Sequence, residues 1–208
     1  MKISLIISAY NEEKYIGACL QSVLKNSQNK FHEIIVVDND STDNTRNIVE
    51  KYPKVKVVTE LKKGPNYARQ KGFEVANGEI VAFIDADNQM SKDWIDILIN
   101  EFTNDRNMCC LAGPYQYYDL PKWKNLISTS FWDILVYPTY LLVGYMTNAG
   151  NVAIKKEVLE KMNGIDTSIP FYGDDTNFAR RASKFGKVKF KLDFFMYSSA
   201  RRLIGQGA

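Results

Sequence analysis

Two carboxylates separated by a single residue follow an apolar run in the segment Phe83-Ile84-Asp85-Ala86-Asp87. The run has the composition of a buried strand, so both aspartates are expected where that strand ends. Hard divalent cations such as Mg²⁺ and Mn²⁺ prefer oxygen ligands, and one or two carboxylates together with a diphosphate complete such a shell. The motif therefore indicates a metal site that holds phosphate groups. The alternative is a solvated turn, because this spacing of aspartates also arises by chance.

A second acidic cluster, residues 38–43, follows the apolar run 33–37. The carboxylate of Asp38 is placed to accept a hydrogen bond from a nucleotide base or a ribose hydroxyl. Asp43 has a different interpretation, as a cap of the helix that follows, because a side-chain oxygen at a helix start accepts a free backbone N–H.

Positive charge and a helix start coincide in the segment 63–72. Pro65 suits a first helical turn, and Arg69 and Lys71 follow it closely. Because a helix N-terminus attracts anions, this segment predicts a contact with phosphate. The alternative is an ordinary helix with solvated basic residues.

The adjacent carboxylates of Asp174 and Asp175 stand at the start of another predicted helix, which also carries Arg180 and Arg181. Neighbouring negative charges raise one pKa of an acidic pair, which suits a general base. The same two residues are also suitable helix caps.

The elements that must position these residues alternate between strand and helix over residues 1–105. Continuous apolar runs predict strands near 3–7, 33–37, 55–59 and 80–84. Continuous runs are typical of a parallel sheet covered on both faces, and alternation with helices is typical of an α/β fold. The polar clusters follow these strands, at the carboxyl ends where such sheets bind ligands.

The second half of the chain is less regular. Short strands are predicted at 109–113, 152–154, 188–190 and 194–197, and a helix at 176–184. The segment 126–146 is strongly apolar and aromatic, and Asp133 is its only charged residue. Neither a repeat nor a low-complexity linker divides the chain, so we expect residues 1–208 to form one domain with two halves, 1–105 and 106–208.

Composition excludes several classes of protein. The 208 residues include 27 Lys and Arg against 24 Asp and Glu, a net charge of +3 that lacks the basic excess of a nucleic-acid binder. The single histidine, His32, excludes mechanisms that need two imidazoles. The 3 cysteines lack zinc-site spacing and fit a reducing cytosol. The N-terminus does not resemble a signal peptide, because Asn11 interrupts a short apolar stretch. We therefore expect a cytoplasmic protein.

Six motifs in this order resemble the family 2 glycosyltransferases with the GT-A fold. They are Tyr10-Asn11-Glu12-Glu13, Val37-Asp38-Asn39 with Ser41-Thr42-Asp43, Ala68-Arg69 before Gly72, Asp85-Ala86-Asp87, Asn148-Ala149-Gly150-Asn151 and Gly173-Asp174-Asp175. The resemblance extends from Ile3 to about Leu203. It implies a Rossmann-like, mostly parallel sheet with helices on both faces, a nucleotide-sugar-binding half and an acceptor-binding half.

The resemblance also implies roles for single residues. Those implied to bind the donor nucleotide-sugar are Ala9, Tyr10, Glu12, Asp38, Arg69, Asp85, Ala86, Asn148 and Gly150. Asp87, together with Asp85, would hold Mg²⁺ or Mn²⁺. Asp175 matches the catalytic base and Asp174 the acidic residue before it, where the family more often has glutamate.

The chemistry of glycosyl transfer is consistent with these roles. Breaking the bond between the anomeric carbon and phosphate increases the negative charge of the diphosphate, which a metal at Asp87 would stabilise. An inverting displacement needs one base on the opposite face to take the proton of the acceptor hydroxyl, and Asp175 is the candidate. UDP is the expected nucleotide because it is the commonest in the family, with GDP or dTDP as alternatives. The acceptor is a saccharide, a polyprenyl-linked glycan or another lipid.

Two segments leave alternatives open. Arg201 and Arg202 either contact the diphosphate or lie on the surface. The segment 126–146 is an acceptor-side wall of the cleft, a peripheral membrane contact with aromatic residues at the interface, or a membrane span, against which Asp133 and Pro138 argue. Membrane contact through 122–146 would favour anionic headgroups, a lipid-linked acceptor and a position on the inner face of the membrane.

Other functions fit the sequence less well. A sugar nucleotidyltransferase or a dinucleotide oxidoreductase would carry a glycine-rich loop after the first strand, and Ser8-Ala9-Tyr10-Asn11 contains no glycine. The remaining alternative is a non-catalytic nucleotide-sugar binder or membrane-associated scaffold. The presence of Asp85, Asp87 and Asp175 argues against it.

Overall fold

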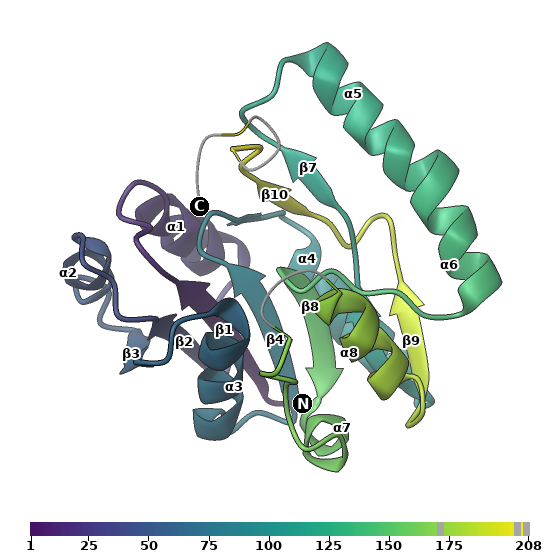
Figure 1. Ribbon diagram of the computed structural model, residues 1–208, viewed down its shortest axis with the longest axis horizontal. Coiled ribbons are helices and arrows are strands. Elements are labelled where there is room, and N and C mark those ends of the chain that lie inside the picture. The colour runs from purple at the N-terminus through teal and green to yellow at the C-terminus, as the bar shows by residue number, and fades with distance from the viewer. Residues whose placement is uncertain (170–172, 202–204, 206–208) are drawn as a thin grey trace.

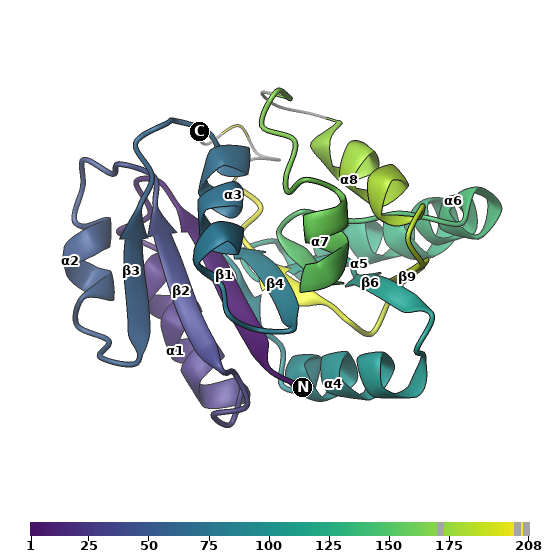
Figure 2. The ribbon, with the colours of Figure 1, turned by 90° about the horizontal axis from the view of Figure 1, so that it is seen from below.

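A computed structural model describes residues 1–169, 173–201 and 205 of the chain. Its largest feature is a seven-stranded sheet with the strand order β3-β2-β1-β4-β8-β6-β9 (Figures 1 and 2). The strands are β1 (Ile3–Ala9), β2 (Glu33–Asp38), β3 (Val55–Thr59), β4 (Ile80–Asp85), β6 (Met108–Ala112), β8 (Asn151–Lys155) and β9 (Lys187–Phe190). Only β8 runs antiparallel to its neighbours within this sheet. The prediction of a mostly parallel α/β sheet is confirmed.

Helices cover both faces of the sheet (Figure 2). On one face lie α1 (Ile16–Asn26), α2 (Thr45–Val49) and α4 (Trp94–Asn104), and on the other lie α3 (Pro65–Val75), α7 (Lys156–Lys161) and α8 (Asp174–Ala182). Each face has its own hydrophobic cluster, because side chains alternate along a strand. In β1, Leu5 and Ile7 belong to one cluster and Ile6 to the other.

The contact between α3 and β1 is especially close. A Cβ atom at Gly72 would lie 2.4 Å from a methyl carbon of Ile6. A side chain at this position would collide with Ile6, so glycine allows the C-terminal half of α3 to pack directly on the middle of β1.

The two halves of the chain contribute strands to the same sheet. β8 lies between β4 and β6, with Ala82 opposite Ala153 and Leu111 also opposite Ala153. The strand itself was expected from its apolar residues, but its antiparallel place between β4 and β6 was not. Strand pairing depends on contacts distant in sequence, which a short apolar run does not specify.

A second, three-stranded sheet was not predicted. It has the order β5-β10-β7 and consists of β5 (Gln89–Met90), β7 (Tyr115–Tyr117) and β10 (Met196–Ser198). β10 runs antiparallel to β5 and parallel to β7. The pairing brings the C-terminal segment beside the turn that follows β4.

The apolar segment forms one long helix along the edge of the molecule (Figure 1). It consists of α5 (Lys122–Phe131), the π-helical turn η1 (Trp132–Val136) and α6 (Tyr137–Val143), and we call it the 122–143 helix. The π-helical turn precedes Pro138, which has no N–H for the regular helical ladder. In the described part of the chain, this helix alone is long and apolar enough to cross a membrane, by length and composition.

The 122–143 helix packs against the domain along one side. Trp132, Tyr137 and Tyr140 contact the hydrophobic cluster beneath it, and the ring of Trp132 stacks on Phe190 at 5.8 Å. None of its residues is fully buried, so most of the apolar surface of the helix faces outward.

Candidate functional site

Three strand ends bring the predicted polar clusters together. In the sheet, Ala9 lies opposite Asp38 and Ser8 lies opposite Asp85. In the strand order β3-β2-β1-β4, the chain runs from β1 through β2 to β3 on one side and then crosses to β4 on the other side of β1. Parallel α/β sheets form a ligand crevice at such a point.

The loops after β1, β2 and β3 form one connected wall of this crevice. The side-chain amide of Asn39 donates to the carbonyl oxygens of Glu60 (2.8 Å) and Lys62 (2.7 Å), and its oxygen accepts the N–H of Gly64. The ammonium of Lys63 lies 4.3 Å from the centre of the Tyr10 ring. Sequence reasoning did not assign Asn39 a role of its own, although its place directly after the strand was a usable signal.

Asp38 is buried at the end of β2, and its carboxylate accepts the N–H of Ser41 at 3.2 Å. Asp43 accepts the N–H groups of Thr45 (2.9 Å) and Glu13 (3.0 Å). Burial alone would raise the pKa of Asp43, but these hydrogen bonds outweigh it and lower the pKa. Asn44, and not Asp43, is the N-cap residue of α2; Asp43 precedes it, accepts the first N–H of the helix and joins it to the loop after β1.

Arg69 connects the two acidic motifs. Its guanidinium lies 3.0 Å from Asp85 and 3.4 Å from Asp174, and it also donates to Asn66 at 3.2 Å. Burial alone would lower the pKa of Arg69, but Asp85 and then Asp175 raise it, so the residue stays charged. From the sequence, Arg69 was expected to contact phosphate of the donor. The structure places it beneath the carboxylates, between the strand end and α8.

The loop 147–150 lies against Asp85. A Cβ atom at Gly150 would lie 2.3 Å from a carboxylate oxygen of Asp85 and 1.9 Å from the hydroxyl of Tyr115, so a larger residue here would have to displace these side chains. Asn88 donates to the carbonyl oxygen of Gly150 at 2.6 Å, and Asn148 donates to Gly113 at 3.4 Å. Asn148 and Gly150 thus adjoin the Asp85 motif, whereas Tyr115 and Asn88 were not predicted.

Asp175 has a strongly perturbed carboxylate. Burial and the adjacent charge of Asp174 raise its pKa to about 6, while Arg69 and the N–H of Ala149 act in the opposite direction. The hydroxyl of Thr147 donates to the backbone oxygen of Asp175 at 2.8 Å. The first turn of α8 is thus joined to the loop that carries Gly150. The pKa lies close to neutral pH, as a general base requires.

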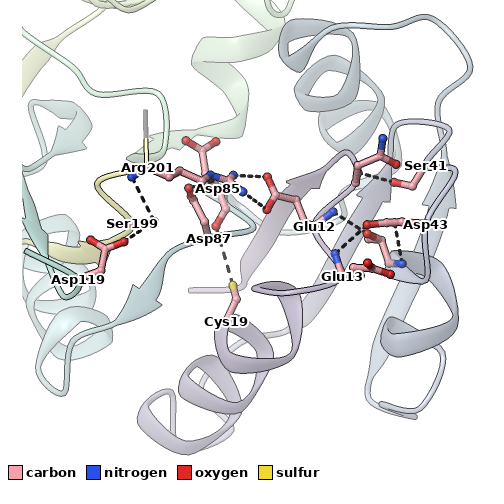
Figure 3. A network of polar contacts seen from close by, with 12 residues as sticks. Glu12, Glu13, Cys19, Ser41, Asp43, Asp85, Asp87, Asp119, Ser199 and Arg201 are labelled. Carbon is pink, nitrogen blue, oxygen red and sulfur yellow. Dashed lines mark hydrogen bonds and ion pairs between the residues drawn. The ribbon is translucent and has the colours of Figure 1, made fainter. Parts of the chain in front are cut away.

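Arg201 joins the loop after β1 to the Asp85–Asp87 turn (Figure 3). Its guanidinium forms a two-point ion pair with Glu12, of which the Nη1–Oε2 bond measures 2.8 Å, and lies 3.1 Å from Asp87. It also stacks over the ring of Tyr15 at 4.5 Å. Burial alone would lower the pKa of Arg201, but Glu12 and Asp87 raise it. Of the two positions predicted for this arginine, the structure places it in the site rather than on the surface.

Asp119 anchors the segment that carries Arg201 (Figure 3). Its carboxylate accepts the hydroxyl of Ser199 at 2.6 Å and the N–H of Ala200 at 2.8 Å. The neighbouring Tyr118 donates its hydroxyl to the backbone oxygen of Asp87 at 3.3 Å. Sequence reasoning missed Asp119, because a lone aspartate in a loop has no distinctive spacing.

A few predicted residues need separate mention. Ala9, Ala86 and Glu12 are buried at the strand ends, and Tyr10 is exposed. Arg202 lies outside the described residues. Within the described ranges, no three His, Cys, Asp or Glu side chains gather as a ready-made metal site. Asp85 and Asp87 provide carboxylate oxygens, so a metal here would need further ligands from phosphate or water.

Comparisons with known proteins identify relatives of this chain. It is 40% identical over 101 residues to the poly(ribitol-phosphate) beta-N-acetylglucosaminyltransferase TarS of Staphylococcus aureus, covering 46% of this chain and 18% of TarS. It is 26% identical over 193 residues to the glucosyl-dolichyl phosphate glucuronosyltransferase of Haloferax volcanii, covering 84% of this chain and 59% of that enzyme. The chain thus spans less than two thirds of the length of these relatives.

Solved structures share the fold. Truncated TarS in complex with UDP-GlcNAc matches with a TM-score of 0.69 and 23% identity, over 96% of this chain and 58% of that one. The mannosyltransferase PcManGT of Pyrobaculum calidifontis, in complex with GDP-Man and Mn²⁺, matches with a TM-score of 0.70 and 22% identity, over 96% and 57% of the two chains. The fold is therefore that of the GT-A glycosyltransferases. The family model for glycosyl transferase family 2 matches residues 4–202, nearly the whole chain, and this protein belongs to that family.

Proposed function

We propose that this protein transfers a sugar from a nucleotide-diphospho-sugar, with UDP as the preferred nucleotide, to a hydroxyl of a saccharide or a lipid-linked acceptor. Family membership supports glycosyl transfer. The observation that carries the proposal is the position of Arg69, which contacts Asp85 on one side and Asp174 on the other. The motif for the leaving diphosphate and the motif for the base therefore meet at one buried arginine.

Divalent metal use is part of this proposal. Asp85 and Asp87 would hold Mg²⁺ or Mn²⁺ through carboxylate oxygens, which are the ligands these hard cations prefer. The donor set fits, because Mg²⁺ is commonly bound by one or two carboxylates together with substrate phosphates. When bound, the cation supplies positive charge opposite the diphosphate. Its binding in PcManGT, as Mn²⁺ with GDP-Man, is consistent with this assignment.

Arg201, together with Arg202, would contribute further positive charge toward the diphosphate. The support is the placement of Arg201 directly at Asp87 and Glu12. The guanidinium balances the negative charge of two carboxylates in the crevice. Its planar set of N–H donors also suits phosphate oxygens.

Asp175 would act as the general base, and the reaction would invert the anomeric configuration. With a pKa of about 6, the carboxylate is mostly ionised at neutral pH and still basic enough to take a proton. The N–H of Ala149 orients it. A single displacement requires no covalent intermediate, and the protein then needs only one base opposite the leaving group.

The acceptor class is proposed from the relatives. TarS is named for a poly(ribitol-phosphate) acceptor, and the Haloferax enzyme for a glucosyl-dolichyl phosphate. We therefore propose an acceptor that is either a saccharide-type polymer or a lipid-linked sugar. The cytoplasm, with contact to the inner face of the membrane, is the compartment that agrees with this activity.

The Asp175→Asn variant tests whether the protein is an enzyme or only a binder. We expect this variant to bind UDP as the wild type does, while transfer from a UDP-sugar is lost. The matched control is Asp96→Asn, an exposed aspartate that pairs with Lys30 far from the crevice. Wild-type protein that binds UDP but shows no transfer, with hydrolysis and acceptor screens included, would instead support a non-catalytic nucleotide-sugar binder.

A further inference from the structure

The outer side of the 122–143 helix carries large apolar side chains that nothing in the described structure covers. The exposed fractions are 62% for Trp123, 61% for Ile127, 76% for Ile134, 64% for Leu141 and 89% for Leu142. Together with Phe131 they form what we call the apolar face. Scattered exposed apolar residues need no explanation, but a continuous row of this kind indicates a docking surface.

The opposite side of the same helix packs against the domain. Trp132 stacks on Phe190, and the hydroxyl of Tyr140 donates to the backbone oxygen of Val188 at 3.4 Å. A helix that crossed a bilayer alone would have to leave these contacts. The structure therefore favours a helix that lies along a surface, with its apolar face directed away from the protein.

We propose that the apolar face lies in the headgroup–acyl interface of a lipid bilayer that contains anionic lipids. Amphipathic helices bind in this way, with the apolar side inserted by about 5–10 Å and basic residues near the headgroups. This inference rests on the function proposed above and narrows its acceptor. A protein held at the bilayer would use a lipid-linked acceptor.

The size of the apolar face favours a bilayer over a second copy of the chain. A helix of this length is about 33 Å long and about 10 Å wide. Pairing of two such faces would bury roughly 300–350 Å² per copy, whereas a stable interface buries about 800 Å² per partner. A bilayer has no such requirement, because it surrounds each inserted side chain.

The charges at the start of the helix complement an anionic membrane. Lys122 and Lys124 are exposed on either side of Trp123, and the ammonium of Lys124 lies 5.4 Å from that ring. Tryptophan prefers the membrane–water interface, and each lysine near an anionic surface adds to binding. The helix carries a single acidic residue, Asp133.

The helix begins beside the candidate donor site. In the loop before it, Tyr118 contacts the backbone of Asp87 and Asp119 contacts the backbone of Ala200. A bilayer on the apolar face would therefore hold the crevice at a fixed position relative to the membrane. This arrangement suits an acceptor whose hydroxyl is presented from the lipid surface.

Co-sedimentation of the full chain with vesicles tests the proposal. We expect wild-type protein to sediment with vesicles of phosphatidylcholine and phosphatidylglycerol, and less with phosphatidylcholine alone. Combining Ile134→Asp with Leu142→Asp should weaken binding by about tenfold or more, because binding scales with the inserted apolar area. Leu61→Asp is the matched control, since Leu61 is 73% exposed outside this helix. It should bind vesicles as the wild type does.

Quenching by brominated lipids provides an independent readout. Trp94 is buried and Trp132 is half-buried against Phe190, so quenching that Trp123→Phe removes would place Trp123 in the bilayer. UDP binding without vesicles is measured in parallel, which separates failure of this proposal from failure of the donor site. Wild-type protein that stays in the supernatant with both vesicle types would overturn the proposal. A dimer that Leu142→Asp converts to a monomer, without vesicle binding, would overturn it in favour of a second copy.

Discussion

The guanidinium of Arg201 lies 3.1 Å from the carboxylate of Asp87 and simultaneously forms a two-point ion pair with Glu12. Glu12 follows β1, Asp87 follows β4 and Arg201 follows β10. Three segments that are distant in the sequence therefore meet at the guanidinium of Arg201. The contact compensates the negative charge of a crevice that is proposed to take a still more negative diphosphate. Its removal should therefore affect both folding and donor binding.

Replacing Arg201 by alanine should destabilise the protein by about 3 kcal/mol, because two largely buried carboxylates lose their partner. We also expect Mn²⁺ to raise the thermal midpoint of this variant more than that of the wild type, since the cation would supply the missing charge. Arg46→Ala, which breaks an exposed pair with Glu50, is the control and should cost at most about 1 kcal/mol. Equal melting curves for the two variants would contradict the role given to Arg201.

Asp119→Ala should raise the KM for the donor by about tenfold and change kcat less, because Asp119 acts only by holding the segment of Arg201. Asp119→Asn should recover part of the effect, since its amide oxygen still accepts the N–H of Ala200. Steady-state kinetics at several donor concentrations separate the two constants. Asp193→Ala, at an exposed ion pair with Lys191, serves as the control. A loss confined to kcat would argue against a positioning role.

The activity should depend on the ionisation of Asp175. With a pKa of about 6, kcat should fall about tenfold per pH unit below that value and reach a plateau above it. Asp175→Asn should lower kcat by about 10²–10⁴-fold at pH 7 and remove this pH dependence. Initial rates across the acidic range provide the measurement. A wild-type profile that is flat between pH 5 and pH 8 would be inconsistent with this base.

Asp175 should also make stability depend on pH. Its pKa in the folded protein, about 6, is higher than its ordinary value of 3.8. The folded state therefore binds the proton more tightly, and the resulting stability is complete below about pH 4 and lost as the pH rises through 6. In Asp175→Asn no buried carboxylate has to ionise. This variant should therefore be more stable than wild type at pH 8, by at most about 3 kcal/mol. The difference should disappear toward pH 4. Thermal unfolding at both pH values provides the test, and a variant less stable than wild type at pH 8 would contradict it.

Replacing Gly150 and Gly17 by alanine compares a tightly surrounded glycine with one that has free space around it. Gly150→Ala would place a methyl group 1.9 Å from the Tyr115 hydroxyl, so we expect loss of donor binding as the loop moves away from Asp85. In Gly17→Ala the nearest atom lies at 3.8 Å, and the helical position should gain up to about 1 kcal/mol. Titration with UDP and thermal unfolding of both variants provide the comparison. Undiminished UDP binding by Gly150→Ala would show that this packing is not needed.

The strands of the first half could be predicted from the sequence because they are continuous apolar runs. Their carboxyl ends then follow from chain direction, so the meeting of Asp38 and Asp85 at one edge was predictable. Arg69 could be named as a candidate from its position at a helix start, but its place between Asp85 and Asp174 could not be predicted, because it depends on how α3 packs against the sheet. A close approach such as that of Gly72 to Ile6 is decided by packing.

The remaining features depend on contacts that local patterns do not encode. The place of β8 between β4 and β6, and the small sheet around β10, are pairings between distant segments. Asp119 and Asn39 hold loops through backbone groups, and such roles leave no spacing signature. The segment 126–146 had three interpretations in the sequence. The structure adds that one side of its helix is packed on the domain while the apolar face remains exposed.

The proposed glycosyl transfer requires a nucleotide-sugar donor that binds at Asp87 with a divalent cation. Calorimetric titration of UDP, and of GDP for comparison, with and without Mn²⁺ tests it most directly, on wild type and on Asp87→Ala with folding verified by circular dichroism. We expect UDP binding that requires Mn²⁺ and is lost in Asp87→Ala, while Asp96→Asn binds as wild type does. Folded wild-type protein that binds neither nucleotide, or Asp87→Ala that binds UDP undiminished, would contradict the account.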